Sequence, residues 1–253
     1  MDTLIGLALF SLGAVLASFL AVVAERLYTG ESWVKGRSRC NSCAEHLTGR
    51  DLVPVFSWIA SGGRCRTCGS QVPISYMVGE ATLGSVFLLG YLSLGFSLLL
   101  PLFLLIVSVL AFIVLYDLRH TVVPVFASRT LVVLSLLYAF LASPDLQALG
   151  LTLLTAGMVS LFFFLAYAIS RGRAMGLGDA PVALALCLLV GGPFALPGFL
   201  FSFWIGGIVG IAILVSRPKG RRMGIEVPFV PFLAAGYLLA FFTQWNPLLM
   251  PIM

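Results

Sequence analysis

Gly176-Leu177-Gly178-Asp179 separates a basic segment from a new apolar run and puts a carboxylate at the mouth of an expected membrane helix. Such a carboxylate is costly unless it is paired, hydrated or used, so its first interpretation is functional. Among the ten acidic residues, the best placed partner is Asp117, which ends another long apolar run in Leu115-Tyr116-Asp117-Leu118-Arg119. Two carboxylates at helix ends suggest an acid/base pair.

The composition indicates a membrane protein. Hydrophobic residues make up 60% of the chain and charged residues 10%, and the mean hydropathy is +1.07. A soluble domain of 253 residues with this composition would have too little polar surface to face water. The first apolar stretch lacks the basic start and the cleavage site of a signal peptide and is long enough to span. We therefore expect an all-α polytopic membrane protein with a retained first helix.

The apolar runs predict about eight transmembrane helices. Their expected ranges are 3–24, 76–95, 97–116, 125–142, 147–169, 180–191, 195–215 and 229–244. The sixth is short for a span of about 20 residues. The chain is expected to divide into a first helix (1–24), a domain outside the bilayer (25–75) and a transmembrane domain (76–253) that carries Asp117 and Asp179.

The basic residues predict the orientation, because Lys and Arg are retained on the cytoplasmic side. With the N-terminus outside, every one of the 15 Lys and Arg residues except Arg129 falls in or beside a cytoplasmic loop. The opposite loops carry Asp2 and Asp145 and no basic residue. The same topology places Asp117 and Asp179 at one membrane depth, at the cytoplasmic face.

At that depth the two carboxylates could act together. Close carboxylates do not both ionise easily, so one holds a proton while the other is charged. Such a pair can activate a water against an amide carbonyl and protonate the leaving amine. Gly176 and Gly178 would let the backbone approach a peptide or adopt a positive φ. The ordinary alternatives are an N-cap for Asp179 and an interfacial ion pair with Arg119 for Asp117.

The loop at about 25–75 contains two Cys-x-x-Cys pairs, and it is the only segment long enough to fold outside the bilayer. A closed site of four thiolates suits structural tetrahedral zinc. Disulfides are less favoured in a reducing cytoplasm, and His46 could replace a ligand only if one cysteine were not used. Much of this small loop's fold would come from the metal. The expected ligands are Cys40, Cys43, Cys65 and Cys68.

Two further residues need an interpretation. Cys187 lies inside the sixth predicted span and is expected to be a small buried hydrophobic residue. Glu80 lies within the second span, near its cytoplasmic end, where a long side chain can still reach water.

Taken in order along nearly the whole chain, these motifs resemble the type IV prepilin peptidases, membrane aspartyl proteases with a G-x-G-D motif. The resemblance rests on Ala17 to Leu20 with Arg26, the two cysteine pairs, Pro54 with Ser57-Trp58, Ile74-Ser75 with Glu80, Asp117 with Val123-Pro124, Gly176 to Asp179, and Pro228-Phe229-x-Pro231. It implies that Asp117 and Asp179 are the catalytic pair, that Gly176 and Gly178 form the active-site loop, and that the cysteines bind zinc.

The resemblance also implies the partners and the place of action. The substrates would be precursors of type IV pilins and pseudopilins, cut where a basic leader meets a hydrophobic helix at the cytoplasmic face of the bacterial inner membrane. The second activity would methylate the new N-terminal amine with S-adenosylmethionine, although no local motif for that cofactor is present. Membrane lipid is an expected partner and nucleic acid is not.

Three positions differ from the family pattern. Ala21 stands where asparagine is usual, Val125 where aspartate is usual after Pro124, and Pro181 where lysine often follows the turn. None of them removes a carboxylate of the expected pair.

Two other functions are compatible with the same residues. One is a transporter or channel that uses the carboxylates as a relay, with the zinc loop as a gate, although relays usually place their acids near the midplane. The other is a non-catalytic scaffold of a secretion assembly.

Overall fold

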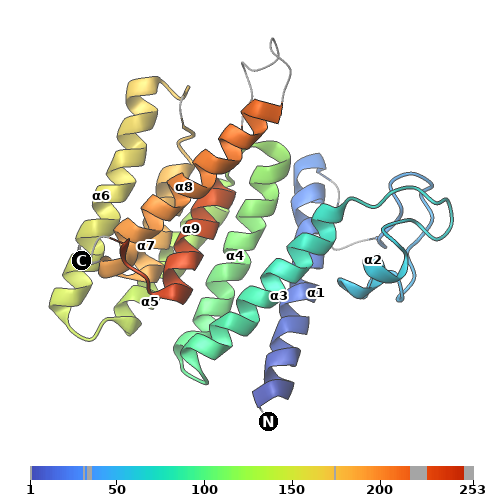
Figure 1. Ribbon diagram of the computed structural model, residues 1–253, viewed down its shortest axis with the longest axis horizontal. Helices are drawn as coiled ribbons and strands as arrows, with labels where there is room; N and C mark the ends of the chain where they lie inside the picture. The colour runs from blue at the N-terminus through green and yellow to red at the C-terminus, as the bar shows by residue number, and fades with distance from the viewer. Residues whose placement is uncertain (1, 31, 33–35, 174, 217–226, 248–253) are drawn as a thin grey trace. The chain divides into compact units, whose positions relative to one another are not determined.

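The computed structural model describes residues 2–30, 32, 36–173, 175–216 and 227–247. Over these ranges the chain is helical, with two isolated β-bridges and no β-strand. The helices, labelled in Figure 1, are α1 (Asp2–Thr29), α2 (Phe56–Ala60), α3 (Ile74–Leu94), α4 (Leu99–His120), α5 (Val125–Ala142), α6 (Leu146–Ser170), α7 (Asp179–Val190), α8 (Gly192–Ser216) and α9 (Val230–Thr243).

An apolar helix occupies each of the eight predicted spans. Six of them, α1, α3, α4, α5, α6 and α8, are long and apolar enough to cross a membrane, whereas α7 and α9 have 12 and 14 residues. The chain is therefore an all-helical, multi-pass membrane protein, and the count of eight full spans stays a prediction. The first helix continues five residues beyond the predicted end, past Arg26 to Thr29. The guanidinium of Arg26 donates to the backbone carbonyl of Ser32 at 3.2 Å. Arg26 therefore lies within the helix, and its side chain extends past the end of the helix.

The chain folds as two compact units, residues 1–100 and 101–253. In the first unit α1 packs against α3 along a seam of small residues. A Cβ added to Gly13 would lie 2.8 Å from the carbonyl oxygen of Leu83, and one added to Gly84 would lie 2.8 Å from that of Phe10. The two backbones are therefore in contact, as small residues allow in membrane helices. Ala21, one of the positions that differ from the family pattern, is buried on this face of α1.

In the second unit α7 forms the core. It packs against α5, α6, α8 and α9, and all its residues except Pro181 and Leu184 are buried. A helix of 12 residues is only about 18 Å long, which is short for a bilayer core of about 30 Å. A short helix is tolerated at this depth because neighbouring helices, and not lipid, surround it.

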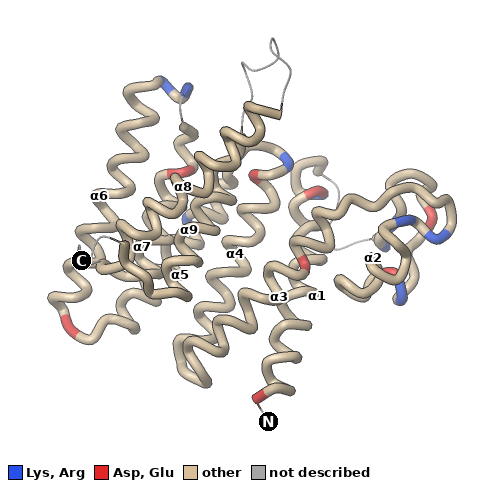
Figure 2. Tube along the Cα trace, viewed as in Figure 1, with Lys and Arg blue, Asp and Glu red and all other residues tan. Residues whose placement is uncertain are grey.

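The charges of the second unit separate along its helices. Asp145 caps the start of α6, while Arg171 and Arg173 follow its end and Arg119 lies in the last turn of α4. Figure 2 shows the arginines of α4 and α6 at one end of this unit and the acidic cap of α6 at the other. This separation agrees with the predicted charge asymmetry. Some of the basic residues behind that prediction lie outside the described ranges, namely Lys35, Arg217, Lys219, Arg221 and Arg222.

Candidate active site and metal site

Asp117 and Asp179 lie at the ends of two helices of the second unit. Asp117 is in the last turn of α4, and Asp179 is the first residue of α7. Both are buried, at 5% and 7% exposure, and they are close enough to interact electrostatically. In Figure 2 the acidic segments of α4 and α7 lie toward the same end of the unit as the arginines. The structure thus brings together two carboxylates that are 62 residues apart in the sequence.

Each carboxylate is held by one backbone N–H group. The N–H of Gly176 donates to Asp179 Oδ2 at 3.2 Å, and the N–H of Asp179 donates back to the carbonyl oxygen of Gly176 at 3.2 Å. Asp117 Oδ2 accepts from the N–H of Val230, the first residue of α9, at 3.3 Å. No direct hydrogen bond joins the two carboxyl groups in this part of the described chain, so both retain acceptor positions for water or substrate.

The Gly176–Asp179 turn differs from an ordinary helix N-cap. The N-cap residue of α7 is Gly178, which has no side chain to offer, and Asp179 points its oxygen back to Gly176 instead of forward into the helix. The expectation of a positive φ at Gly176 or Gly178 is wrong, because neither glycine has one. Gly178 has a helical φ of −66°, and what excludes a side chain there is contact with a neighbour.

That neighbour is Val123, in the turn between α4 and α5. A Cβ on Gly178 would lie 2.5 Å from the Cβ of Val123, whereas a Cβ on Gly176 would lie at an ordinary 3.7 Å from its nearest neighbour, Asp179 Oδ2. The turn that carries Asp179 is thus packed directly against the turn that follows Asp117. Sequence reasoning missed this contact and the Val230 N–H, although both segments belong to motifs that carry the family resemblance.

The environment of the pair is apolar and aromatic. Phe229, beside Val230, has its ring 5.2 Å from that of Phe203 and 6.0 Å from that of Phe163, so it joins the start of α9 to α8 and α6. Ser160 of α6 donates to the carbonyl oxygen of Ala180 at 3.1 Å, which ties α6 to the first turn of α7. These contacts hold in place the start of α9, whose N–H group binds Asp117, and the start of α7, which carries Asp179.

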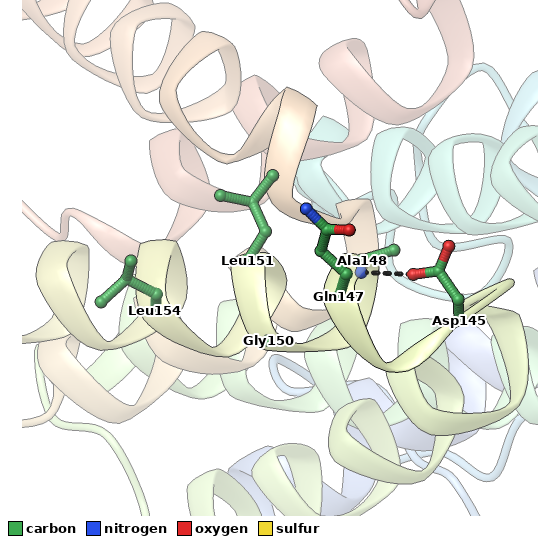
Figure 3. A pocket seen from close by; sticks show the side chains of 6 residues that line it. All are labelled: Asp145, Gln147, Ala148, Gly150, Leu151 and Leu154. Atoms are coloured by element: carbon green, nitrogen blue, oxygen red, sulfur yellow. Dashed lines mark hydrogen bonds between the residues drawn. The ribbon is translucent and has the colours of Figure 1, made fainter.

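A separate hollow lies at the start of α6 (Figure 3). It is lined by Asp145, Gln147, Ala148, Gly150, Leu151 and Leu154. Asp145 Oδ1 accepts from the N–H of Ala148 at 2.7 Å, which is an ordinary N-cap. The lining of this hollow has one carboxylate, and that carboxylate already caps the helix. The hollow therefore does not offer a pair of acids like the one at the other end of the unit.

The four predicted cysteines of the first unit converge. Their Sγ atoms all lie within 4.8 Å of one another, and those of Cys40 and Cys68 are 3.9 Å apart. Four thiolates at about 2.3 Å from a tetrahedral metal lie about 3.8 Å apart. The cluster therefore fits a metal ion such as zinc, and all four ligand positions are filled by protein. Cys187 lies far along the chain, is buried as predicted, and contacts the hydroxyl of Tyr237 at 3.0 Å.

The two cysteine pairs form matching turns. In the first, Ala44 donates its N–H to the carbonyl oxygen of Cys40 at 2.9 Å; in the second, Gly69 donates to that of Cys65 at 2.9 Å. Each turn is closed by an isolated bridge, Arg39 with His46 and Arg64 with Gln71. Backbone N–H groups, that of Cys43 foremost, lower the pKa of the Cys40 thiol to about 6, whereas, against the N–H of Glu45, desolvation and the neighbouring thiols raise the pKa of the Cys43 thiol to about 12.

Side-chain contacts support the loop around the cysteines. Asp51 accepts from the hydroxyl and the N–H of Thr48 at 2.6 and 3.0 Å and pairs with Arg66 at 3.2 Å. The hydrogen bonds from Thr48 hold the pKa of Asp51 below its ordinary value, so this carboxylate is ionised at neutral pH. The indole N–H of Trp58 donates to the carbonyl oxygen of Val72 at 3.1 Å. His46 is exposed and lies outside the cysteine cluster.

Two buried carboxylates at helix ends of one unit and a four-cysteine cluster in the other are the features expected of a membrane aspartic protease with a metal-binding accessory domain. Two family models match the chain, one in each unit. Residues 11–94 match the bacterial peptidase A24 N-terminal domain, and residues 103–211 match the type IV leader peptidase family. The chain belongs to the type IV leader peptidase family.

Curated relatives extend over most of the chain. It is 29% identical to the prepilin leader peptidase/N-methyltransferase of Bacillus subtilis, over 92% of each chain. It is 32% identical to the protein of the same name from Dichelobacter nodosus, over 79% of this chain and 69% of that one. The Myxococcus xanthus protein of that name is 28% identical over 83% of this chain and 64% of its own length. No solved structure matches the chain.

Proposed function

We propose that this enzyme cleaves the leader peptide from type IV prepilins and pseudopilins at the cytoplasmic face of the bacterial inner membrane, with Asp117 and Asp179 as the catalytic pair. The observation that carries the proposal is the burial of these two carboxylates at helix ends, in turns that pack against each other at Gly178 and Val123. The names of the relatives supply the substrate class.

In the proposed mechanism the charged carboxylate takes a proton from a water held between the two groups. The water attacks the carbonyl carbon of the scissile amide, and the protonated carboxyl group gives its proton to the leaving amine. The Gly176 and Val230 N–H groups keep one oxygen of each carboxylate in place. The other oxygen of each carboxylate would then be available to the water and the scissile amide.

The orientation is part of the proposal. With the N-terminus outside, the ends of α4 and α6 and the zinc loop all face the cytoplasm, which agrees with their arginines. The relay function is less well supported, because it requires acids near the midplane, whereas Asp117 and Asp179 lie in the last and first turns of their helices.

Zinc and methyl transfer complete the proposal. The four-cysteine site would hold zinc as a structural ion, because it offers no open position for substrate. Methylation of the new N-terminal residue from S-adenosylmethionine follows from the names of the relatives, and we assign no residue of this chain to it. Mass spectrometry of the cleaved pilin, with and without the methyl donor, tests this second activity independently of the first.

Asparagine substitutions test the catalytic pair. Asparagine keeps the shape of aspartate and can accept the same N–H bonds, but it cannot cycle a proton. We expect Asp117→Asn and Asp179→Asn each to reduce cleavage of a prepilin by purified protein by at least about 10³-fold, the upper part of the range for loss of a general acid or base. The measurement is the initial rate of leader release, read by gel shift and mass spectrometry.

Asp145→Asn is the matched control. It makes the same chemical change at the start of α6, at the end of the unit opposite the pair. Asparagine caps a helix about as well as aspartate, so cleavage should be unchanged. Wild-type cleavage by both active-site variants, in protein that remains folded, would show that the carboxylates are structural. Proton or cation flux in liposomes that depends on Asp117, without cleavage, would favour the relay.

A further inference from the structure

The zinc loop has an apolar surface on α2 that its own fold leaves bare. Leu52 and Val53, just before α2, are 46% and 47% exposed, and Phe56 and Ile59 within it are 70% and 61% exposed. We call these four residues the α2 patch. Single exposed apolar side chains are common on protein surfaces, but four within eight residues concentrate apolar surface in one short segment, as interaction sites do.

The opposite face of α2 is used by the loop itself. Trp58 donates to the carbonyl oxygen of Val72, and its ring lies where a Cβ on Gly63 would be only 2.6 Å away. Phe56 and Ile59 are three residues apart and so share a face of the helix. The helix therefore has one face built into the zinc loop and one apolar face that the described part of the loop leaves largely exposed.

A hydrogen bond fixes α2 beside a membrane helix. Glu80 Oε2 accepts from the N–H of Val55, the residue before α2, at 2.7 Å. Glu80 lies six residues beyond Ile74, where α3 begins, or about 9 Å along the helix axis. The beginning of α2 is thus held level with the second turn of α3. Figure 1 agrees, since α2 lies lower in the view than the start of α3.

The backbone at this point is held in a rare conformation. Val55 has φ 63° and ψ −54°, and the N–H of Phe56 donates to the carbonyl oxygen of Pro54 at 2.6 Å. This is a classic γ-turn, which is uncommon and strained, and a β-branched residue with positive φ is an outlier. The bond from Glu80 stabilises the turn by satisfying the N–H of Val55. The position of the patch is therefore imposed by α3.

The described loop between α1 and α3 carries more basic than acidic residues. Arg50, Arg64 and Arg66 are exposed. The acidic residues of the described loop are Glu45 and Asp51, and Asp51 is engaged by Arg66. Exposed apolar side chains in a loop with an excess of arginines suit the boundary between anionic headgroups and acyl chains.

We propose that the α2 patch inserts into the headgroup boundary of the same bilayer that α1 and α3 cross, and that the Glu80–Val55 bond sets its depth. The occupant of this surface is the lipid of that leaflet. The zinc loop is then held against the membrane by three attachments: the ends of α1 and α3 and the patch between them.

Photocrosslinking to lipid tests the proposal. The full chain, with p-benzoylphenylalanine at Phe56 or Ile59, is placed in nanodiscs of phosphatidylethanolamine and phosphatidylglycerol that contain a radiolabelled lipid. Exposed Glu45, in the first cysteine turn of the same loop, is the matched control position. We expect lipid labelling at 56 and 59 to exceed that at 45 by at least about fivefold, as residues inside and outside the interface should differ. Zinc content checks that the loop is folded.

Two further measurements separate the parts of the proposal. Glu80→Ala should reduce lipid labelling at 56 severalfold, whereas Glu80→Gln, which keeps an acceptor oxygen, should retain it. Replacing phosphatidylglycerol by phosphatidylcholine should lower labelling if the arginines bind anionic headgroups. Equal labelling at 56, 59 and 45 would overturn the proposal. So would crosslinks from 56 and 59 to a second copy of the chain or to a prepilin instead of lipid.

Discussion

Gly178→Ala should push the Gly176–Asp179 turn away from the turn that follows Asp117. The backbone of Gly178 is helical, so alanine adds no conformational strain, and the whole effect comes from the new Cβ meeting that of Val123 at 2.5 Å. Carbon atoms in contact lie about 3.5–4.0 Å apart, so the turns must move apart by about 1 Å. A displacement of that size at a catalytic group can reduce the rate by about 10²-fold. We expect this loss in kcat/KM for prepilin cleavage.

The structure provides a rescue and a control for this prediction. Removing the opposing Cβ in the double variant Gly178→Ala/Val123→Gly should restore cleavage by at least about tenfold over Gly178→Ala alone, which is a double-mutant cycle with favourable coupling. Gly176→Ala changes a glycine of the same turn, but its Cβ would be at an ordinary contact distance of 3.7 Å. It should therefore cause a much smaller loss.

The measurement is steady-state cleavage of a purified prepilin, with thermal unfolding followed by circular dichroism to show that each variant is folded. Wild-type activity of folded Gly178→Ala would refute the reasoning, because it would mean that the spacing of the two turns does not matter. A failure of Val123→Gly to rescue would mean that the lost activity has another origin.

The remaining predictions concern the zinc loop. Chelating the metal should make the loop sensitive to proteases, because small metal domains fold on binding; equal resistance with and without chelator would contradict this. Ala44 and Gly69 have φ of 58° and 71° at matching positions, so Ala44→Gly should tighten and Gly69→Ala weaken zinc binding by up to about 1 kcal/mol, about fivefold. Competition with a chromogenic chelator measures both, and changes of the same sign would refute it. Gly63→Ala should weaken binding more than Gly62→Ala, because both have positive φ but only Gly63 contacts Trp58; equal losses would exclude that contact as the cause.

Local patterns in the sequence predict the helices and the cysteine site well. Long apolar runs predict an apolar helix in all eight ranges, because hydrophobicity over about 20 residues is a strong signal. Two Cys-x-x-Cys pairs predict a four-thiolate cluster, because each turn presents its two sulfurs locally and the metal has a fixed geometry. The charge asymmetry predicts that Asp117 and Asp179 share one end of the bundle, because each follows or precedes a basic loop.

Contacts between distant segments could not be predicted in this way. The N–H of Val230 lies 113 residues from Asp117, and no periodicity connects them. For Gly178 the sequence leaves open a positive φ or an approach to a peptide; its helical φ excludes the first, and its contact with Val123 could not be predicted. The γ-turn at Val55 depends on a carboxylate 25 residues away. A valine there would be expected in an extended conformation.

The way the carboxylates are held argues for hydrolysis over ion transfer. A relay residue must exchange partners as its ion moves, so it is best served by flexible side chains and water near the midplane. Asp117 and Asp179 instead each accept one N–H from the backbone, at the start of α9 and in the Gly176–Asp179 turn. Backbone donors hold one oxygen of each carboxylate in one place, and such preorganisation is what a positioned acid and base require.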